Sequence, residues 1–324
     1  MAEGEGFEPS TPVTQGKHLA GARTRPLCDP SLAYVILLHP ADFYNRSLSL
    51  PVSSIELVYA ILVCSDMAKD ILSAEAITQG LETRVIGRRV LYYPSVTSTN
   101  EVAKQQARQG ADEGTVVIAD EQTVGKGRLK RLWLTPGGNI ALSVILRPEM
   151  AALPSMIMLA SLAVLRGIES ATGLKAGIKW PNDVLIGGRK VCGILIENDL
   201  RGSILNYTVI GIGINTGLRT EDFPEIRATA TSLDAELGRE VSRLSVVRRL
   251  LAEMDRLYLS LPDNNAVYEE WRANLVTLGK AVHVIAGETV YEGVAESVSR
   301  DGSLLLRGPD GSLTPVVAGD VTLR

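Results

Sequence analysis

The segment Glu121–Trp133 carries the residues best suited to chemistry on phosphorylated substrates. It reads EQTVGKGRLKRLW, so two glycines alternate with Lys126 and Arg128, and Lys130 and Arg131 follow. Glycine lets backbone N–H groups approach an anion closely, and the lysine and arginine side chains add cationic donors. This basic loop by itself predicts an oligophosphate site, a solvated basic turn or a nucleic-acid patch. It is not a Walker A loop, because glycine rather than Ser or Thr follows Lys126.

Four more motifs accompany the basic loop. They are Ser98-Thr99-Asn100 after a strand-like Val90–Tyr93, then KWPND at Lys179–Asp183, RKVCGILIE at Arg189–Glu197, and VIGIGINTG at Val209–Gly217. The apolar alternation on both sides of Gly187-Gly188 predicts a β-hairpin with a two-residue turn. Lys190 therefore begins a strand close to the Pro-Asn-Asp turn. The glycines of Val209–Gly217 keep one face of a buried strand open.

These motifs, in this order, resemble those of the biotin protein ligases. The series S-T-N, Q-T-x-G-[KR]-G-R, K-W-P-N-D, R-K-x-x-G-I-L-x-E and G-I-G-I-N belongs to a match that spans roughly Ser73 to Arg324. Any one motif occurs by chance, whereas five in sequence hardly do. The resemblance implies an α+β fold with a mixed β-sheet flanked by helices, of the class II synthetase-like, biotin/lipoate ligase type. A small SH3-like β-barrel is expected to follow.

The resemblance also implies a two-step reaction. The biotin carboxylate attacks the α-phosphate of ATP to give biotinyl-5′-AMP and pyrophosphate, and a lysine of a biotin carboxyl carrier protein then attacks that anhydride. The expected ligands are biotin, ATP and Mg²⁺, because two anions must be brought together. The expected partner is the carrier domain of a biotin-dependent carboxylase. The oligomeric state, monomer or homodimer, is left open.

By resemblance, the site residues come from all five motifs. Lys190 and Arg128 are the expected catalytic residues, and Asp183 is the expected Mg²⁺ ligand. The residues expected to bind biotin or ATP are Ser98, Thr99, Asn100, Gln122, Gly125, Lys126, Gly127, Arg128, Arg131, Trp133, Asn182, Asp183, Lys190, Gly193, Gly211 and Asn215. Relatives often read G-R-G-R-x-G-R, so Lys126 replaces an arginine and keeps the charge without the planar fork. Lys130 stands where a glycine is common.

Several of these residues also have ordinary structural explanations. Ser98 and Glu101 form the pattern of a capping box, with Ser at the N-cap and Glu three residues on. Asn182 and Asp183 follow a proline in a good turn sequence. A lysine at a strand start such as Lys190 is more often just solvated, and only the R-K-x-x-G context favours a functional role.

Composition places the chain among ordinary globular proteins. The 324 residues are 45% hydrophobic with a net charge of −4, so the basic loop is a local feature, which favours a small anionic ligand over a long polyanion. Three cysteines and three histidines lack the spacing of a disulfide framework or a zinc site. The run Leu57–Cys64 is too short to span a bilayer. We expect a soluble, cytoplasmic protein without membrane association.

Apolar periodicity predicts mixed helices and strands, then a run of short strands. The predicted helices are about Ser98–Gly110, Pro154–Gly173, Ser245–Leu261 and Val267–Asn274, and the predicted strands of the main sheet are Thr115–Glu121, Asn139–Leu146, Ala176–Trp180, Val184–Ile186, Lys190–Glu197 and Asn206–Asn215. After Gly279 the short runs Ala281–Ala286, Thr289–Val298, Leu304–Arg307 and Thr314–Val317 predict a small barrel. We expect a catalytic domain over 71–277 and an SH3-like domain over 278–324.

Residues 1–70 differ from the rest of the chain and stay unassigned. They match nothing in the ligase family, and we expect either a disordered extension or translation from a start codon too far upstream. Ser54–Leu72 alone looks helical, and no basic recognition helix follows it, so specific DNA binding is not expected. The alternatives are a lipoate ligase-like acyl-adenylate transferase, a bifunctional ligase and biotin operon repressor, and a pure binding module.

Overall fold

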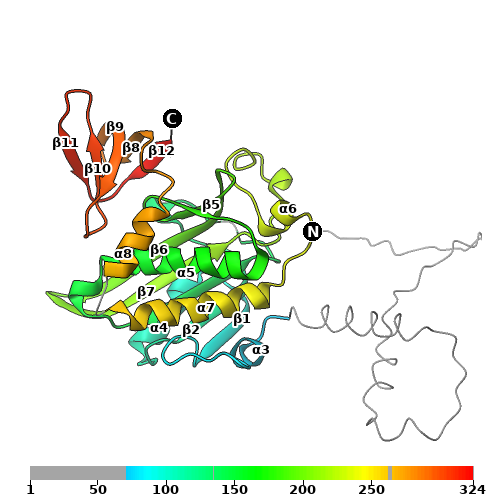
Figure 1. The fold of residues 1–324 in the computed structure, drawn as a ribbon. Helices are drawn as coiled ribbons and strands as arrows, with labels where there is room; N and C mark the ends of the chain where they lie inside the picture. Colours follow the sequence, from blue (N-terminus) through cyan, green and yellow to red (C-terminus); the bar gives the residue numbers. More distant parts are fainter. Residues whose placement is uncertain (1–70, 134, 262–264, 324) are drawn as a thin grey trace, which may run out of the picture. The chain divides into compact units, whose positions relative to one another are not determined.

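The structure, a computed structural model, describes residues 71–133, 135–261 and 265–323 (Figure 1). Its larger sheet has seven strands in the order β1-β2-β3-β7-β6-β5-β4, in which β1 and β2 are parallel and all other neighbours are antiparallel. The strands are β1 (Val90–Val96), β2 (Val116–Gln122), β3 (Ile140–Leu146), β4 (Gly177–Lys179), β5 (Asp183–Ile186), β6 (Arg189–Arg201) and β7 (Ile204–Ile214). The predicted α+β class with a mixed sheet is confirmed.

Alternation along the strands divides the apolar side chains between two faces of this sheet. In β2, Val116 and Ile118 belong to the main hydrophobic core, whereas Val117 belongs to a smaller cluster with Ala103 and Ala107. Successive strand side chains point to opposite faces, so each face needs its own cover. Helix α4 (Thr99–Arg108) covers one face, and α5 (Ser155–Thr172) and α7 (Arg243–Leu259) lie over the other (Figure 1). The other α-helices of the described residues are α3 (Ala74–Thr78), α6 (Leu233–Leu237) and α8 (Asn265–Ala273).

Helix α5 is the central helix of the larger core. Among the described residues it is the one helix long and apolar enough to cross a membrane, but 67% of that stretch is buried inside the protein. It packs on α7, where a side chain on Gly167 would approach Leu250 Cα to 3.0 Å. Gly173, with φ +78°, ends the helix in the left-handed conformation typical of a C-terminal glycine. The composition of α5 is therefore that of a core helix.

The predicted hairpin between β5 and β6 is confirmed. Ile186 pairs with Arg189 across Gly187 and Gly188, whose φ angles are +57° and +81°. A two-residue turn of this kind needs positive φ at both central positions, which glycine adopts without steric penalty. The hairpin makes Lys190 the second residue of β6. Strand β6 pairs with β5, which begins at Asp183.

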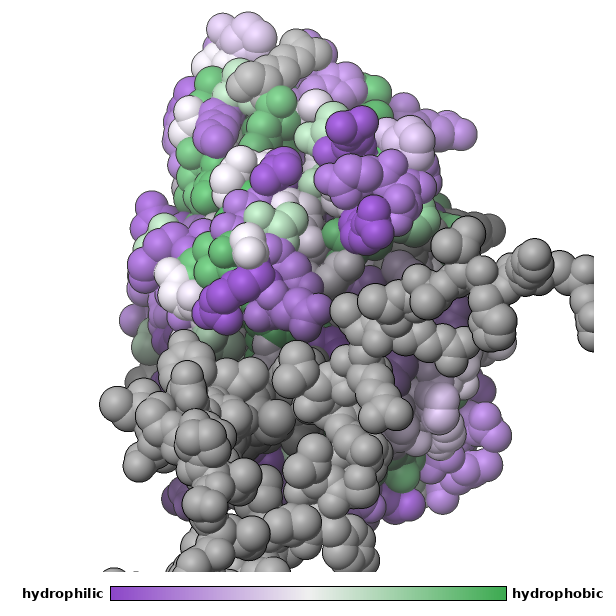
Figure 2. Space-filling view, turned by 90° about the vertical axis from the view of Figure 1, so that its right-hand side faces the viewer, coloured by the Kyte–Doolittle hydropathy of each residue, from purple (hydrophilic) through white to green (hydrophobic). Residues whose placement is uncertain are grey.

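A second, five-stranded antiparallel sheet forms the C-terminal part in the order β11-β10-β9-β8-β12. Its strands are β8 (Ala281–Ala286), β9 (Thr289–Val298), β10 (Leu304–Arg307), β11 (Leu313–Val316) and β12 (Asp320–Leu323). Its buried residues join the main core, and Trp180 Nε1 donates to the Gly302 carbonyl at 2.8 Å. The surface in the upper part of Figure 2 carries both hydrophobic and hydrophilic residues, which lie in separate patches.

The elements predicted within the described residues are present with boundary shifts of one or a few residues, and three short α-helices or strands of those residues were missed. These are α3, α6 and the last strand β12. Each is four or five residues long, too short to show a hydrophobic period. The predicted helix within Ser54–Leu72 lies almost wholly outside the described residues.

Candidate functional site

A cleft of about 710 Å³ opens at the ends of β6 and β7, between the basic loop and the C-terminal sheet. Fifteen of the sixteen predicted site residues line it: Ser98, Thr99, Asn100, Gln122, Lys126, Gly127, Arg128, Arg131, Trp133, Asn182, Asp183, Lys190, Gly193, Gly211 and Asn215. The remaining one, Gly125, does not. Its carbonyl accepts from Trp133 N at 2.8 Å, and a side chain there would meet the Trp133 carbonyl at 2.3 Å. Gly125 therefore shapes the loop instead of the cleft surface.

Glycines of adjacent strands form a flat floor for Trp133. Gly193 of β6 and Gly213 of β7 are register partners. A Cβ atom on Gly213 would lie 2.2 Å from Trp133 Nε1, and one on Gly193 would lie 2.9 Å from Trp133 Cζ3. On the same face of β7, two residues before Gly213, a Cβ atom on Gly211 would lie 2.1 Å from Asn100 Oδ1. The predicted open face of this strand is thus occupied by the indole and an amide in close contact with backbone.

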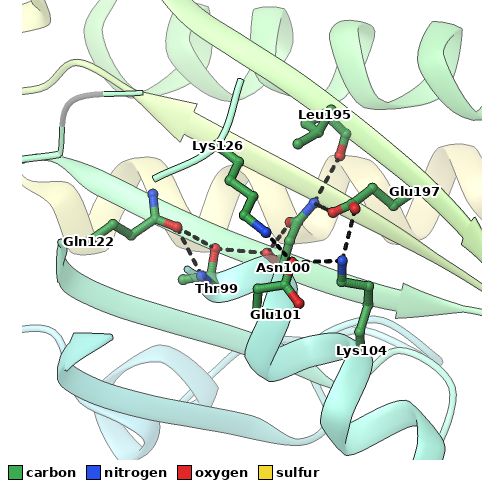
Figure 3. Close-up of polar contacts among 9 residues, drawn as sticks. Thr99, Asn100, Glu101, Lys104, Gln122, Lys126, Leu195 and Glu197 are labelled. Carbon is green, nitrogen blue, oxygen red and sulfur yellow. Dashed lines mark hydrogen bonds and ion pairs between the residues drawn. The ribbon is translucent and has the colours of Figure 1, made fainter. Parts of the chain in front are cut away.

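Polar side chains form the wall of the cleft on the α4 side (Figure 3). Gln122 Oε1 accepts from the Thr99 backbone N–H at 2.9 Å and lies 3.1 Å from Thr99 Oγ1. Gln122 Nε2 donates to Thr135 Oγ1 at 3.0 Å. Because both ends of the Gln122 amide are engaged, its carbonyl oxygen has one defined direction. Such a wall suits a polar, uncharged ligand group.

The predicted capping box is wrong in its hydrogen bonds. Ser98 occupies the N-cap of α4, yet its side chain makes no capping hydrogen bond and is only 2% exposed. Glu101 instead contacts Lys104 Nζ at 2.8 Å and Lys126 Nζ at 2.5 Å. Hydrogen bonds from Lys104 and Lys126 hold the pKa of the Glu101 carboxyl below its usual value. Two ammonium groups are stronger partners for a carboxylate than one backbone N–H, so Glu101 turns away from the cap.

The basic loop folds back on itself as a short hairpin. Gly127 N donates to the Arg131 carbonyl at 2.8 Å, and the backbones of Lys126 and Leu132 form an antiparallel β-bridge. At the tip, Leu129 has φ +53°, a conformation that costs a non-glycine residue about 1 kcal/mol. The loop is tied down at three points: Lys126 to Glu101, Arg128 to Asn182, and Arg131 to Asp320.

Lys190 lines the cleft and contacts two other lining residues. Its Nζ is 2.7 Å from Asp183 Oδ1 and 5.1 Å from the centroid of the Trp133 ring. The Lys190 backbone is fixed separately, since its N–H donates to the Thr229 carbonyl at 2.8 Å and its carbonyl accepts from Thr231 N at 2.9 Å. The ammonium group is therefore held over the glycine floor by a carboxylate and an aromatic face.

Asn182 and Asn215 use part of their side chains to hold the cleft together. Arg128 Nη1 donates to Asn182 Oδ1 at 2.8 Å, and Asn182 Nδ2 donates to the Ile194 carbonyl at 3.0 Å. Asn215 Nδ2 donates to the Thr231 carbonyl at 3.0 Å. Burial lowers the pKa of Arg128, although a guanidinium stays charged at any ordinary pH. Asn182 thus orients the cation that the sequence predicted as catalytic.

Sequence reasoning missed several residues that line the cleft. Lys179 lines it, and burial lowers the pKa of this ammonium below its usual value. Asp320, Thr322 and five residues of the loop after β7 also line it, namely Glu225, Ile226, Ala228, Thr229 and Ala230. Lys179 belongs to the KWPND motif and could have been chosen for its charge. The others lie in no motif and reach the cleft only through the packing of the C-terminal sheet and of the loop after β7.

The comparisons with known proteins agree with this geometry. A model of the biotin/lipoate A/B protein ligase family matches residues 92–215, and a model of the biotin protein ligase C-terminal domain matches residues 277–324. The bifunctional ligase/repressor BirA of Bacillus subtilis (strain 168) is 34% identical over 258 residues, which cover 78% of this chain and 79% of that protein. The chain belongs to the biotin protein ligase family.

Other members of the biotin protein ligase family match at similar identity. The biotin–[acetyl-CoA-carboxylase] ligase of Paracoccus denitrificans is 34% identical over 227 residues, covering 66% of this chain and 92% of its own length. Among solved structures, the biotin protein ligase of Aquifex aeolicus in complex with biotin and ATP matches with a TM-score of 0.60 and 28% identity, covering 73% of this chain and 99% of that one. The resemblance stated from the motifs is confirmed.

For a biotin protein ligase, ligand-dependent closure of the basic loop is testable by proteolysis. Arg131 is 70% exposed and Lys126 is 48% exposed, so trypsin can reach both in the free protein. We expect cleavage between Lys126 and Arg131 to slow by about tenfold or more when biotin and ATP are both present, because a closed loop excludes protease as it excludes water. Peptide mass mapping locates the cut. Equal cleavage rates with and without ligands would show that this loop is not a lid.

Proposed function

We propose that this chain attaches biotin to a lysine of a biotin carboxyl carrier protein, using ATP and passing through biotinyl-5′-AMP. The observation that carries the proposal is one cleft with two kinds of lining. A polar, uncharged wall around Thr99 and Gln122 suits the ring of biotin, and the cations Arg128, Lys179 and Lys190 suit a carboxylate next to phosphates. The solved family member with biotin and ATP bound supports the same pair of ligands.

In the first step the carboxylate oxygen of biotin attacks the α-phosphorus of ATP and pyrophosphate leaves. Lys190 neutralises charge where the two anions meet, because its ammonium is already held in the cleft and needs little reorganisation. Arg128 is oriented by Asn182 toward the same space. In the second step the neutral amine of the acceptor lysine attacks the acyl carbon, and AMP leaves. Closure of the basic loop keeps water from that anhydride in the meantime.

Mg²⁺ belongs to this proposal through Asp183. The described residues contain no group of three His, Cys, Asp or Glu side chains that could hold a metal by themselves. Mg²⁺ in nucleotide enzymes is commonly bound by one or two carboxylates together with substrate phosphates, and a single Asp183 fits that donor set. When bound, the ion would neutralise phosphate charge. Asp183, now paired with Lys190, would then be shared between the two cations.

We also propose a division into two domains, an acceptor protein and a compartment for this chain. Residues 71–277 act as the catalytic domain and 278–324 as an SH3-like domain, which the antiparallel sheet β8–β12 supports. The acceptor is the carrier domain of a biotin-dependent carboxylase, and the enzyme works in the cytoplasm. Residues 1–70 lie outside the described residues. Weak or absent binding to a biotin operator therefore stays a prediction, checked by footprinting with the full chain.

The decisive experiment is biotin transfer followed by intact mass spectrometry. The purified chain, ATP, Mg²⁺ and biotin are incubated with a biotin carboxyl carrier domain, and we expect that domain to gain one biotinyl group at a single lysine. The matched control uses a carrier domain with that lysine changed to arginine. Lipoate in place of biotin tests the lipoate ligase alternative. Transfer of lipoate but not biotin, or of neither, would refute the proposal.

A further inference from the structure

A charged pair behind the cleft holds the side-chain amide of Asn100 (Figure 3). Asn100 Nδ2 donates to Glu197 Oε2 at 2.7 Å and lies 3.5 Å from the Leu195 carbonyl. The other carboxylate oxygen, Glu197 Oε1, accepts from Lys104 Nζ at 2.8 Å. Although burial opposes its charge, hydrogen bonds to Glu101 and Glu197 raise the pKa of Lys104. Neither Glu197 nor Lys104 lines the cleft.

A row of oxygen atoms leads from Asn100 to the cleft wall. Ser143, which is fully buried, has its Oγ 2.6 Å from Asn100 Oδ1 and 2.8 Å from Thr99 Oγ1. Thr99 Oγ1 is in turn 3.1 Å from Gln122 Oε1. Thr99 and Gln122 line the cleft. The row therefore connects the charged pair behind the wall with the surface that a ligand touches.

This row has three oxygen–oxygen contacts and only two protons. The amide oxygens of Asn100 and Gln122 can only accept, and the hydroxyls of Ser143 and Thr99 carry one proton each. One contact must therefore lack a proton. Which contact it is depends on the direction in which the two hydroxyls donate.

Glu197 fixes the direction in which Ser143 donates. A carboxylate only accepts, so the Asn100 NH₂ group must face Glu197 and Asn100 Oδ1 must face Ser143. Ser143 then donates to Asn100. The Thr99 hydroxyl could donate to Ser143 at 2.8 Å or to Gln122 at 3.1 Å; we infer that it donates to Ser143, because that contact is shorter and Gln122 Oε1 already accepts from the Thr99 backbone N–H. The contact left without a proton is that between Thr99 Oγ1 and Gln122 Oε1, which at 3.1 Å is also the longest of the three.

We propose that Glu197 is a positioning residue that sets the direction of this hydrogen-bond chain and so keeps Thr99 Oγ1 and Gln122 Oε1 together as acceptors for an N–H group of the substrate. The inference rests on the proposed function, because the ureido ring of biotin supplies such N–H donors. A ligand N–H placed between these two acceptor oxygens gains a hydrogen bond and relieves the repulsion between their lone pairs. A ligand that presents an acceptor there is rejected.

The test exploits the fact that lysine can only donate. In Glu197→Gln, Lys104 holds the new amide oxygen, so the Gln NH₂ group meets the Asn100 NH₂ group. Asn100 is then expected to turn over, after which Ser143 donates to Thr99 and Thr99 donates to Gln122. The acceptor pair is lost. We expect the Kd for biotin, measured by calorimetry, to rise about tenfold or more, with the Kd for ATP within about threefold of wild type.

Lys104→Met provides the rescue. Without the lysine, the Gln amide oxygen can turn to Asn100 Nδ2 and restore the original direction. We expect Lys104→Met with Glu197→Gln to bind biotin within about threefold of Lys104→Met alone. A purely structural role of Glu197 predicts the opposite, since losing both partners would weaken the fold further. Biotin binding by Glu197→Gln within about threefold of wild type, or no rescue in the double variant, would overturn the inference.

Ser143→Ala keeps the inference testable if Glu197→Gln does not fold. Removing this hydroxyl leaves Thr99 free to donate to Gln122, so biotin binding should again weaken about tenfold, and here Lys104→Met should give no rescue. Unchanged biotin binding by Ser143→Ala would also overturn the inference. Failure of the wild-type chain to bind biotin would instead contradict the proposed function.

Discussion

Replacing Lys190 by alanine is expected to slow biotinyl-adenylate formation by about 10²- to 10³-fold while leaving the fold intact. The ammonium lies 2.7 Å from Asp183 and faces the cleft, where the carboxylate and α-phosphate would meet. Removing a preorganised cation beside developing negative charge raises the barrier by roughly 2.7 to 4 kcal/mol. The backbone hydrogen bonds of this residue to Thr229 and Thr231 are retained in the variant.

Pyrophosphate release in a single turnover with biotin and ATP measures this effect directly. The side chain of Lys190 is partly exposed, so its loss should change the free energy of unfolding by about 1 kcal/mol or less. Lys175→Ala is the matched control, because that lysine is 87% exposed and does not line the cleft. Pyrophosphate release by Lys190→Ala within about threefold of wild type would remove this residue from the mechanism.

Replacing Asp255 by alanine is expected to destabilise the protein by about 3 kcal/mol or more without altering the cleft. This carboxylate on α7 is 4% exposed and accepts three backbone hydrogen bonds. The donors are Arg84 N at 2.9 Å, Val85 N at 2.8 Å and Ile86 N at 2.8 Å. Each buried N–H left without a partner costs about 1–3 kcal/mol.

Urea unfolding monitored by tryptophan fluorescence gives the free energy of unfolding for this comparison. Asp255→Asn should be intermediate, because one amide oxygen can still accept from Val85 and Ile86 while its NH₂ group faces Arg84. Asp222→Ala is the control, since that carboxylate is 58% exposed and lies 3.7 Å from Arg219 in an exposed ion pair. A destabilisation by Asp255→Ala below about 1 kcal/mol would mean that water satisfies these donors.

The sequence by itself determined most of the elements, and fifteen of the residues predicted from its motifs line the cleft. Val90–Tyr93 and the alternating runs around Gly187-Gly188 predicted strands because a period of two needs no distant partner to be recognised. The glycines at positions 193, 211 and 213 can also be recognised from the sequence alone, because each interrupts a run of apolar residues. Close approach to Trp133 and Asn100 is what they permit.

Only the tertiary structure decided how those residues are paired. Glu101 has the spacing of a capping residue, yet Lys104 and Lys126 take its carboxylate. Asp183 was predicted as a metal ligand, and in the structure it is paired with Lys190. A charged side chain can satisfy several partners, and the strongest one nearby prevails, whether it is three residues away or on another element. The spacing of residues along the chain therefore cannot show which of several possible partners a charged side chain will pair with, because some of those partners come from distant segments.

The C-terminal strand gives the clearest case of this limit. Asp320 at the start of β12 pairs with Arg131 of the basic loop, although 188 residues separate them in the sequence. β12 is four residues long and shows no period of its own, so its position depends on pairing with β8. The sequence determined that a cationic loop exists and which ligands suit it. The packing of the second sheet decided what holds that loop and what closes the far side of the cleft, because those contacts join segments with no local pattern in common.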